Sequence, residues 1–515
     1  MQGKQPHWWQ TRGFVVAMAV WAAIPLLWPD IPPLVDLPGH MGRYRVQLDG
    51  GAHPWLSEWF DFRWSLIGNL GIDLLIIPLA PLFGLELAVK LIVIAIPVLT
   101  VTGLLWIARE VHGEIPATAL FALPLAYSYP FQFGFVNFAL SIALALNLFA
   151  LWLRLARLAR LRLRAAIFLP ASCLLWLCHT FGWGVLGVLA FSAEMIRQHD
   201  RMTDRGVRHW LRAWTRAGLG CLPLALPFLL MIAWRSGDHV TGQTIDWFNW
   251  RAKVSWFTMV LRDRWMTFDL ISTTVLLLIL LKGLRDERIE YSRNLAMSAL
   301  FLLFVFVMLP RIVFGSAYAD MRLAPFVLAI ALIALRAKRG LSMRGATTLA
   351  AVGLAFFGAR IAAQTVSYWL YDRDYDQTLA VTDVLPEGAR VVTFIGRHCP
   401  DHWTYSRLEH IPALLLERKF AYTNDQWSMA GAQLLTARYA AAGRFAHDPS
   451  QMVTDRRCRG QFWRTIDAAL TRFPRAAFDY VYLVHPPAFE PASLAGLTLI
   501  WRNGPNTLYR VDREP

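Results

Sequence analysis

Acidic and basic side chains gather in one short polar stretch near the N-terminus. Asp30 and Asp36 stand on either side of a proline pair, and His40 and Arg43 follow within seven residues of Asp36. The Pro38–Gly39 pair predicts a turn into a short helix, on which His40 and Arg43 share one face. A carboxylate beside such a histidine and arginine could take a proton from a hydroxyl group, which is general-base chemistry. Capping of the following helix is the structural alternative for Asp36.

A second polar stretch, residues 310–322, separates two apolar segments. Its candidate binding residues are Arg311, Tyr318, Asp320 and Arg322. Two guanidinium groups flanking an aromatic ring and an acid could hold a phosphate or pyrophosphate, because the planar guanidinium matches two phosphate oxygens at once. The alternative is an internal ion pair between Arg322 and Asp320 that only fixes the loop.

Three further groups of polar residues are weaker candidates. His179 stands between two apolar segments and is a candidate substrate contact, although a buried histidine with a structural role is the commoner explanation. Residues 235–265 interleave charged side chains with tryptophans, which favours a solvated interfacial helix over a sugar or lipid-head site. The stretch 398–402 has histidine, cysteine and aspartate at a spacing that a metal could use. No second cluster completes a tetrahedral set, so we assign no metal site.

The composition indicates that these polar stretches belong to a membrane protein. Of the 515 residues, 56% are hydrophobic and 17% charged, whereas an ordinary soluble domain is about 45–50% apolar and about 25% charged. The net charge is +15, and residues 1–364 hold 34 basic against 20 acidic residues. Because the basic excess belongs to the apolar part, it favours cytoplasmic loops over a nucleic-acid patch. No nucleic-acid partner is predicted.

The apolar segments predict a helical domain over residues 1–364 that crosses the membrane many times. After the first run at about 13–28, such segments recur at about 67–83, 86–108, 116–130, 134–153, 165–178, 180–196, 217–234, 266–283, 294–310, 323–336 and 345–363. Lys4 and Arg12 precede the first run and Asp30 follows it, which predicts a cytoplasmic N-terminus and a first outer loop at 29–65. Basic loops conflict with three crossings between residues 66 and 131, so one of those runs is interpreted as re-entrant or interfacial. We expect 11 crossings, or 13 if a weak segment has been missed.

Residues 365–515 change character and predict a small α/β domain on the outer side of the membrane. Alternating apolar runs predict strands at 390–395, 479–484, 497–501 and 507–511, with helices at 405–419 and 428–442. Cys399 and Cys458 both lie in this part. An oxidising compartment would permit a disulfide between them.

Several motifs are absent from the sequence. The chain contains no P-loop, no G-x-G-x-x-G after a strand, no G-x-S-x-G and no H-E-x-x-H. Nucleotide hydrolysis and zinc proteolysis are therefore unsupported. A nucleotide-sugar donor would need a cytoplasmic domain, and none is predicted.

This organisation resembles the GT-C superfamily of integral-membrane glycosyltransferases. The shared features are an N-in first helix, an acidic residue early in a long first outer loop, many helices of uneven length and an outer C-terminal α/β domain. The sharpest local matches are VDLPGHMGRYR at 35–45, FGFVNFALSIALALNLFALWLR at 133–154 and YADMRLAP at 318–325. They are similar to stretches of sparsely characterised bacterial members.

The resemblance implies transfer of a sugar from a polyprenyl-phosphate donor to a lipid, glycan or protein acceptor, by an inverting enzyme of the bacterial inner (plasma) membrane with its C-terminal domain in the periplasm. The family's catalytic acid matches Asp36, with Asp30 in reserve. Many members carry two adjacent acids there, whereas this chain spaces them six apart, which leaves open whether a second carboxylate or a divalent cation takes part. Arg311, Arg322 and Arg43 would neutralise the departing lipid phosphate.

Two other functions stay open at this point. A transporter or flippase for a lipid-linked sugar would use the same charged recess to bind its cargo. It should carry polar residues near mid-membrane in broken, pseudo-repeated helices, and this sequence shows no repeat. A membrane assembly subunit whose outer domain binds partners is the third interpretation.

Overall fold

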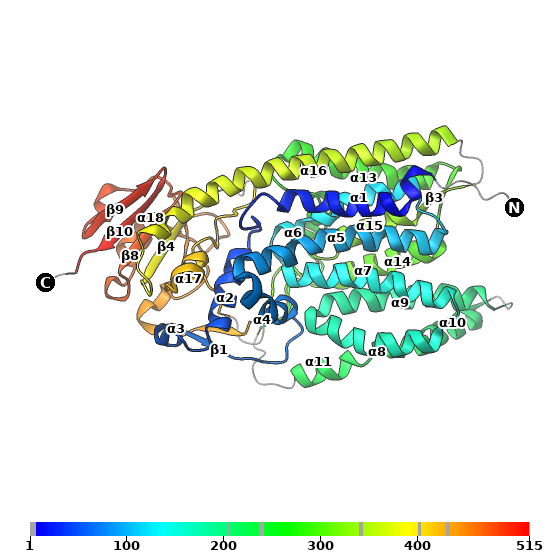
Figure 1. The fold of residues 1–515 in the computed structure, drawn as a ribbon, viewed down its shortest axis with the longest axis horizontal. Coiled ribbons are helices and arrows are strands. Elements are labelled where there is room, and N and C mark those ends of the chain that lie inside the picture. Colours follow the sequence, from blue (N-terminus) through cyan, green and yellow to red (C-terminus); the bar gives the residue numbers. More distant parts are fainter. Residues whose placement is uncertain are drawn as a thin grey trace. The chain divides into compact units, whose positions relative to one another are not determined.

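The computed structural model describes residues 7–202, 206–235, 242–338, 343–399, 403–428 and 433–513. The chain divides into two compact units (Figure 1). The first comprises residues 7–27, 66–72 and 91–366, and the second comprises 28–65, 73–90 and the residues from 367 onward. The sequence-based boundary after residue 364 lies close to the start of the last segment. Each unit is described by itself.

The first unit is helical. Its N-terminal elements are η1 (Trp8–Gln10), α1 (Arg12–Ala23), η2 (Ile24–Leu26), most of α5 (Leu85–His112), η3 (Ala117–Tyr127), α6 (Tyr129–Gln132), α7 (Val136–Arg157), α8 (Leu161–Cys178) and α9 (Thr180–Asp200). Its later elements are α10 (Val207–Gly220), η4 (Leu222–Leu224), α11 (Pro227–Arg235), α12 (Trp250–Thr258), α13 (Met266–Arg285), α14 (Arg293–Met308), α15 (Ala324–Ala334) and the first part of α16 (Met343–Leu379). A short antiparallel pair joins β2 (Ile289–Tyr291) to β3 (Leu335–Ala337).

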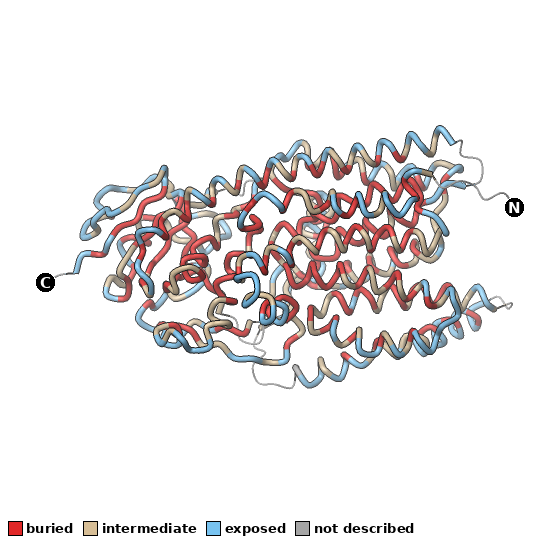
Figure 2. The backbone as a smooth tube through the Cα atoms, viewed as in Figure 1, coloured by how far each residue is buried: buried red, intermediate tan, exposed pale blue. Residues whose placement is uncertain are grey.

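The core of this unit lies along α7, α9, α14 and α15. α7 packs against α9, and α14 packs against both α9 and α15. Nearly every residue of α15 is buried, as the red stretches of Figure 2 show. α8 and α13 instead present large apolar side chains outward, among them Leu174 and Leu278. Helices that are apolar on their exposed faces fit a lipid environment better than water.

Five helices among the described residues are long and apolar enough to cross a membrane: Leu85–His112, Val136–Arg157, Leu161–Cys178, Met266–Arg285 and Met343–Asp383. A sixth span results if α10 and the helical segment after it, bent by 49°, are counted together. Shorter apolar helices occupy Arg12–Leu26, Gly71–Phe83, Arg293–Met308 and Ala324–Ala334. The chain therefore has the helices of a membrane-associated protein. The predicted total of 11 to 13 crossings and the orientation of the termini stay predictions.

The three apolar runs between residues 66 and 131 differ in form. α5 is a full-length apolar helix, whereas α4 (Gly71–Phe83) has 13 residues with two prolines inside it. The predicted segment 116–130 contains the 11-residue 3-10 helix η3 in place of a regular α-helix. An α-helix needs about 20 residues to cross a bilayer, so neither α4 nor η3 spans one by the usual rule. Of the three runs, only α5 is among the helices long enough to cross, whereas the sequence predicts one non-crossing run; the number of crossings between residues 66 and 131 stays a prediction.

The second unit combines helices with a mixed sheet. Its elements are α2 (Leu37–Asp49), α3 (Pro54–Trp59), β1 (Phe60–Phe62), most of α4, the end of α16, η5 (Ala380–Asp383), β4 (Val391–Gly396), α17 (Ala413–Lys419), β5 (Leu435–Ala437), η6 (Ala440–Phe445), β6 (Met452–Thr454), β7 (Arg464–Thr465), α18 (Ile466–Arg472), η7 (Arg475–Ala477), β8 (Tyr480–Val484), η8 (Pro491–Leu494), β9 (Leu497–Asn503) and β10 (Asn506–Val511).

The six-stranded sheet has the order β7-β6-β4-β8-β10-β9. β4 pairs in parallel with both β6 and β8, while β10 pairs antiparallel with β8 and β9. Val392 and Phe394 of β4 face one apolar cluster, and Val391 and Ile395 face another. A strand covered on both faces needs an unbroken apolar run, which the sequence VVTFI supplies.

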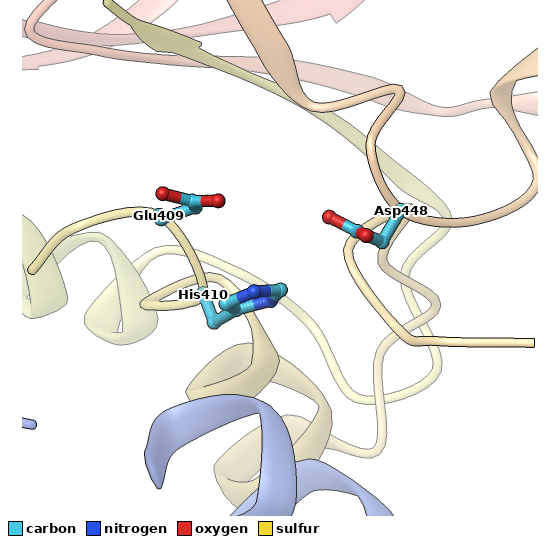
Figure 3. A group of neighbouring side chains, drawn as sticks. All are labelled: Glu409, His410 and Asp448. Atoms are coloured by element: carbon cyan, nitrogen blue, oxygen red, sulfur yellow. The ribbon is translucent and has the colours of Figure 1, made fainter. Parts of the chain in front are cut away.

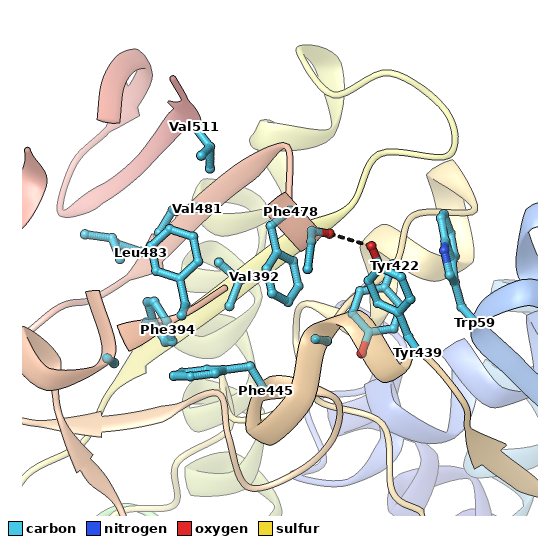
Figure 4. Packing of buried hydrophobic residues seen from close by; sticks show 14 of the residues in the cluster. Trp59, Val392, Phe394, Tyr422, Tyr439, Phe445, Phe478, Val481, Leu483 and Val511 are labelled. Atoms are coloured by element: carbon cyan, nitrogen blue, oxygen red, sulfur yellow. Dashed lines mark hydrogen bonds between the residues drawn. The ribbon is translucent and has the colours of Figure 1, made fainter. Parts of the chain in front are cut away.

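The first of these clusters also contains residues from the segment after α2. Trp59 and Phe60 belong to the cluster that contains Val392 and Phe478, and both rings pack against Tyr422, Trp59 as seen in Figure 4. The hydroxyl of Tyr439, in the same cluster, donates a hydrogen bond to the Ala477 carbonyl at 2.7 Å (Figure 4). β1 pairs with β5 in a separate two-stranded sheet. The predicted first outer loop therefore folds as one unit with the C-terminal residues.

The four predicted strands of the C-terminal part are confirmed as β4, β8, β9 and β10. The helix expected over 405–419 is shorter, because regular helix begins only at Ala413. The helix expected over 428–442 is wrong for its described residues, which form β5 and the start of η6. Pairing of β5 with β1 overrides the local helical pattern there.

Candidate functional site

Asp36 is the residue immediately before α2, but its side chain does not cap the helix. Its backbone holds the N-cap position, and its carboxylate makes no capping hydrogen bond to the first turn. The predicted short helix carrying His40 and Arg43 is confirmed as α2. The capping alternative for the Asp36 side chain is wrong. This carboxylate is 13% exposed, so it lies largely inside the second unit and still reaches solvent.

Two glycines of α2 let other segments approach the helix closely. A Cβ on Gly39 would lie 2.7 Å from the Trp427 ring and 3.3 Å from the His410 ring. A Cβ on Gly42 would lie 3.0 Å from atoms of Ala413 in α17. The spacing of these glycines in the sequence LPGHMGRY therefore brings Trp427, His410 and α17 against the start of α2.

The close approach at Gly39 places His410 beside Asp36. Nε2 of His410 lies 4.0 Å from Oδ1 of Asp36, and the histidine side chain is only 3% exposed. The other ring nitrogen, Nδ1, lies 3.1 Å from the carbonyl oxygen of Asp425 and 3.9 Å from its carboxylate. The Thr423 hydroxyl donates to Oδ1 of Asp425 at 2.6 Å. His410 thus stands between two acidic residues.

Burial and neighbouring charge shift the pKa values of this group. Burial lowers the pKa of His410, but the carboxylates of Asp448, Asp36, Glu409 and Asp425 together raise it above its ordinary value. Burial raises the pKa of Asp425 to about 6, against the opposing effect of His410. A histidine held near carboxylates favours its positive form. The site therefore gathers several acids around one histidine in a largely buried space.

His40 lies next to the same site but in a different state. Its ring packs on Trp427 at a centroid distance of 4.9 Å, and Trp427 in turn packs on His410 at 4.4 Å. Burial lowers the pKa of His40 well below its ordinary value, and the charges of Arg43 and His410 lower it further. His40 is therefore neutral, so it would contact a substrate as a neutral imidazole.

Arg43 and Asp30, two other predicted site residues, have separate partners in the second unit. Nη2 of Arg43 lies 2.7 Å from Oδ1 of Asp73, and both side chains are almost fully buried. Its Nη1 donates to Gln433 at 2.5 Å. Asp30 is exposed, and its backbone N–H donates to Asp372 at 3.1 Å. The predicted roles of Arg43 in substrate binding and of Asp30 as reserve acid stay predictions.

The predicted phosphate-binding residues lie in the first unit. Nζ of Lys253 lies 3.1 Å from Oδ2 of Asp320, and the Trp256 indole N–H donates to Oδ1 at the same distance. The sequence-based alternative named Arg322 as the partner of Asp320. The structure gives Asp320 two other partners, Lys253 and Trp256. Nε of Arg311 lies 2.5 Å from Asp246 in a partly exposed pair.

Aromatic side chains surround Arg322 and His179. The Arg322 guanidinium lies 4.4 Å from the centre of the Phe135 ring and 5.5 Å from that of Phe181. His179 caps α9, because its Nδ1 accepts a hydrogen bond from the Phe181 N–H at 3.1 Å. Its ring packs against Phe138, which also lies within 5.9 Å of Arg322. Arg322 and His179 therefore lie against the same aromatic side chain, Phe138. The capping hydrogen bond of His179 is a structural role, which is the alternative that the sequence analysis gave for this residue.

Tyr318 completes the first unit's group. Its ring packs against Trp256 at 5.9 Å and lies at the same distance from the Arg311 guanidinium. Its backbone φ of 62° is unusual for a residue other than glycine. The predicted residues of 310–322 therefore share one aromatic environment.

Cys399 and Cys458 form a disulfide, with their Cα atoms 5.7 Å apart. A disulfide sulfur is no longer a thiolate ligand, so the spacing of residues 398–402 loses its cysteine as a metal donor. Asp401 and His402 lie outside the described residues.

Sequence reasoning missed the partners of Asp36 in the second unit. The partner beside Asp36 is His410, and the residues around His410 are Glu409, Asp425, Trp427 and Asp448. One signal was available: the polar run Thr423 to Gln426, which stands between Tyr422 and Trp427 and is entirely buried. Buried polar runs need hydrogen-bond partners and often mark sites.

Comparison of the chain with protein-family models, with curated proteins and with solved structures found no match.

Proposed function

We propose that this protein is a membrane glycosyltransferase that moves a sugar from a polyprenyl-phosphate donor to a lipid, glycan or protein acceptor. Asp36 is the general base in this proposal. The observation that carries the proposal is the position of the Asp36 carboxylate. It makes no capping hydrogen bond to α2, it is largely buried, and it lies 4.0 Å from the His410 ring.

The proposed reaction assigns each proton and bond. The acceptor hydroxyl gives its proton to the Asp36 carboxylate while its oxygen forms a bond to the anomeric carbon of the sugar. The bond between that carbon and the phosphate oxygen breaks, and polyprenyl phosphate leaves with the electron pair. A positioned base of this kind contributes on the order of 10²–10⁴-fold to the rate.

The wider properties of the chain support a reaction at a membrane. Among the residues that the structure describes, five helices are long and apolar enough to span a bilayer, which suits a lipid-linked donor. The Cys399–Cys458 disulfide suits an oxidising compartment, in line with the proposed periplasmic location of the C-terminal part. The roles of Arg311 and Arg322 toward a phosphate stay predictions. Arg311 is the more accessible of the two, with a third of its side chain exposed.

The test compares surface glycans and glycolipids by mass spectrometry. A deletion strain of the native host would be complemented with wild type, Asp36→Asn, Asp30→Asn or Asp383→Asn, at equal membrane expression. Asp383 is exposed and serves as the control for substitution of an aspartate elsewhere in the second unit. We expect Asp36→Asn to leave a glycan that lacks one defined sugar, while Asp383→Asn restores it.

The Asp30→Asn variant tests which of the two predicted acids is the base. A missing sugar with Asp30→Asn and a normal glycan with Asp36→Asn would move the base to Asp30. A normal glycan with both variants would contradict the transferase proposal and favour transport or assembly.

A further inference from the structure

Three side chains of the second unit have the composition and spacing of a metal site. We propose that Glu409, His410 and Asp448 bind a divalent cation. One ligand atom from each residue lies within 4.8 Å of those of the other two. Figure 3 shows the imidazole below the two carboxylates, with the Asp448 carboxylate turned toward the other two side chains. This proposal does not depend on the transferase activity.

Each proposed ligand is held by an outer partner. Arg397 donates to Oε2 of Glu409 at 2.6 Å, and Gln451 donates to Oδ1 of Asp448 at 2.7 Å. His410 Nδ1 lies 3.1 Å from the Asp425 carbonyl oxygen. With Nδ1–H donating to that carbonyl, Nε2 keeps its lone pair for a metal. Metal-binding histidines almost always have such a backbone or carboxylate partner on the second nitrogen.

The charges around His410 also favour a bound cation. Besides the two proposed carboxylate ligands, Oδ1 of Asp36 lies 4.0 Å from its Nε2 and Oδ2 of Asp425 lies 3.9 Å from its Nδ1. The Arg397 guanidinium pairs with Glu409 at 2.6 Å. Carboxylates that share a poorly solvated space repel one another. A divalent cation would offset this repulsion more fully than a single protonated imidazole.

Two buried oxygen atoms give a separate indication of a missing partner. Oδ2 of Asp425 and Oε1 of Gln451 are buried, and neither has a hydrogen-bond partner among the described residues. Both residues are fully buried, and each contacts a proposed ligand, His410 or Asp448. Buried polar atoms in native proteins are almost always satisfied. A water molecule on the cation would supply a partner for Oε1 of Gln451, whose amide nitrogen already bonds the Asp448 carboxylate; Oδ2 of Asp425 lies on the other side of the imidazole, 3.9 Å from Nδ1.

The donor set indicates the kind of metal. One imidazole with two carboxylates suits zinc or manganese, whereas copper(I) prefers thiolate or thioether ligands. Two ligand atoms that each lie about 2.2 Å from one ion are at most about 4.4 Å apart, so atoms within 4.8 Å of one another need to move by only a few tenths of an ångström to bind it. The proposal is therefore a zinc- or manganese-type site.

The test measures metal binding by the full-length protein in detergent. The protein would be stripped with a chelator and titrated with ZnCl₂ and, separately, MnCl₂ by isothermal calorimetry. We expect one saturable site per chain for at least one ion. Glu409→Gln and Asp448→Asn should each weaken that binding at least tenfold, as loss of a ligand or of its support does. The control, Asp49→Asn, removes the carboxylate of a His53–Asp49 pair elsewhere in the unit and should leave binding unchanged.

A second measurement needs only the wild-type protein. Iron(II), ascorbate and hydrogen peroxide would generate oxidant at a bound metal, and peptide mass spectrometry would locate the damage. We expect oxidation at His410 and Trp427, whose rings lie 4.4 Å apart, and its suppression by excess zinc. Absence of a saturable site, binding unaltered in both ligand variants, or oxidation unaffected by zinc would overturn the proposal. None of these readouts involves sugar transfer, so failure of the metal site and failure of the transferase are distinguishable.

Discussion

The Asp36 carboxylate lies 4.0 Å from Nε2 of His410, although the two residues are far apart in the sequence. The contact depends on Gly39, because the His410 and Trp427 rings both pack where a side chain at that position would project. α2 and the buried segment around Trp427 are thereby held against each other. A base at Asp36 would depend on this packing.

Gly39→Ala should disturb both stability and activity. The added Cβ would lie 2.7 Å from the Trp427 ring, so the ring or the helix must shift. Overpacking of this kind costs about 1–3 kcal/mol. We expect a lower Tm in detergent and a reduced level of the transferred sugar. Gly184→Ala is the matched control, because nothing lies within 4 Å of a Cβ at that helical glycine. Equal Tm values for the two variants would show that Trp427 does not pack as described.

Removal of one partner from the Arg43–Asp73 pair should be strongly destabilising. Both side chains are almost fully buried at 2.7 Å, and an uncompensated buried charge costs about 3–5 kcal/mol. Arg43→Met and Asp73→Leu should each lower the Tm, and the double variant should recover most of the loss. Thermal unfolding of the three variants measures this.

The same double variant tests whether Arg43 also contacts substrate. Recovery of stability without recovery of sugar transfer would support the predicted binding role. Recovery of both stability and sugar transfer would show that Arg43 has a structural role only. A double variant less stable than either single variant would contradict the pairing.

Reduction of the Cys399–Cys458 disulfide should destabilise the second unit. The bond closes a loop with a sequence separation of 59 residues, and disulfides typically contribute about 2–4 kcal/mol. We expect Cys399→Ser and Cys458→Ser to lower the Tm by similar amounts, with no further loss in the double variant. Alkylation of the unfolded protein should modify three cysteines before reduction and five afterwards, because Cys173, Cys178 and Cys221 are free. Five modified cysteines without reductant would exclude the bond.

Glu417 should make stability depend on pH. Burial raises its pKa to about 7, and the nearby Glu86 carboxylate raises it further, against the opposing effect of Arg45. The ordinary pKa of this side chain is 4.5. Between about pH 4.5 and pH 7 the folded protein therefore keeps a proton on Glu417 that the unfolded chain releases. The contribution of Glu417 to the free energy of unfolding is complete below about pH 4.5 and is lost as the pH rises through 7.

Glu417→Gln removes this titration. The Tm advantage of wild type over the variant should therefore be largest near pH 5 and shrink toward pH 8. The exposed Glu490 supplies the control, Glu490→Gln, which should differ from wild type by a constant amount. A difference for Glu417→Gln that does not change with pH would contradict the raised pKa.

Local patterns in the sequence were enough to predict many elements. The apolar run of β4 and the alternating pattern of β10 predicted strands, and Pro38–Gly39 predicted the start of α2. The large apolar fraction predicted helices able to span a membrane, and five such helices are present among the described residues. These features depend on neighbours within a few residues, so composition and periodicity are sufficient to find them.

Contacts between distant segments decided the rest. Spacing placed Asp36 near His40 and Arg43, but only the folded chain brings in His410 and gives Arg43 its partner Asp73. In the same way, only the folded chain shows that Asp320 pairs with Lys253. The sequence by itself determined the membrane character, the main strands and the position of a candidate acid. The tertiary structure alone decided which buried charges meet. These contacts depend on the packing of distant segments, and the separation of two segments along the chain does not give their distance in space.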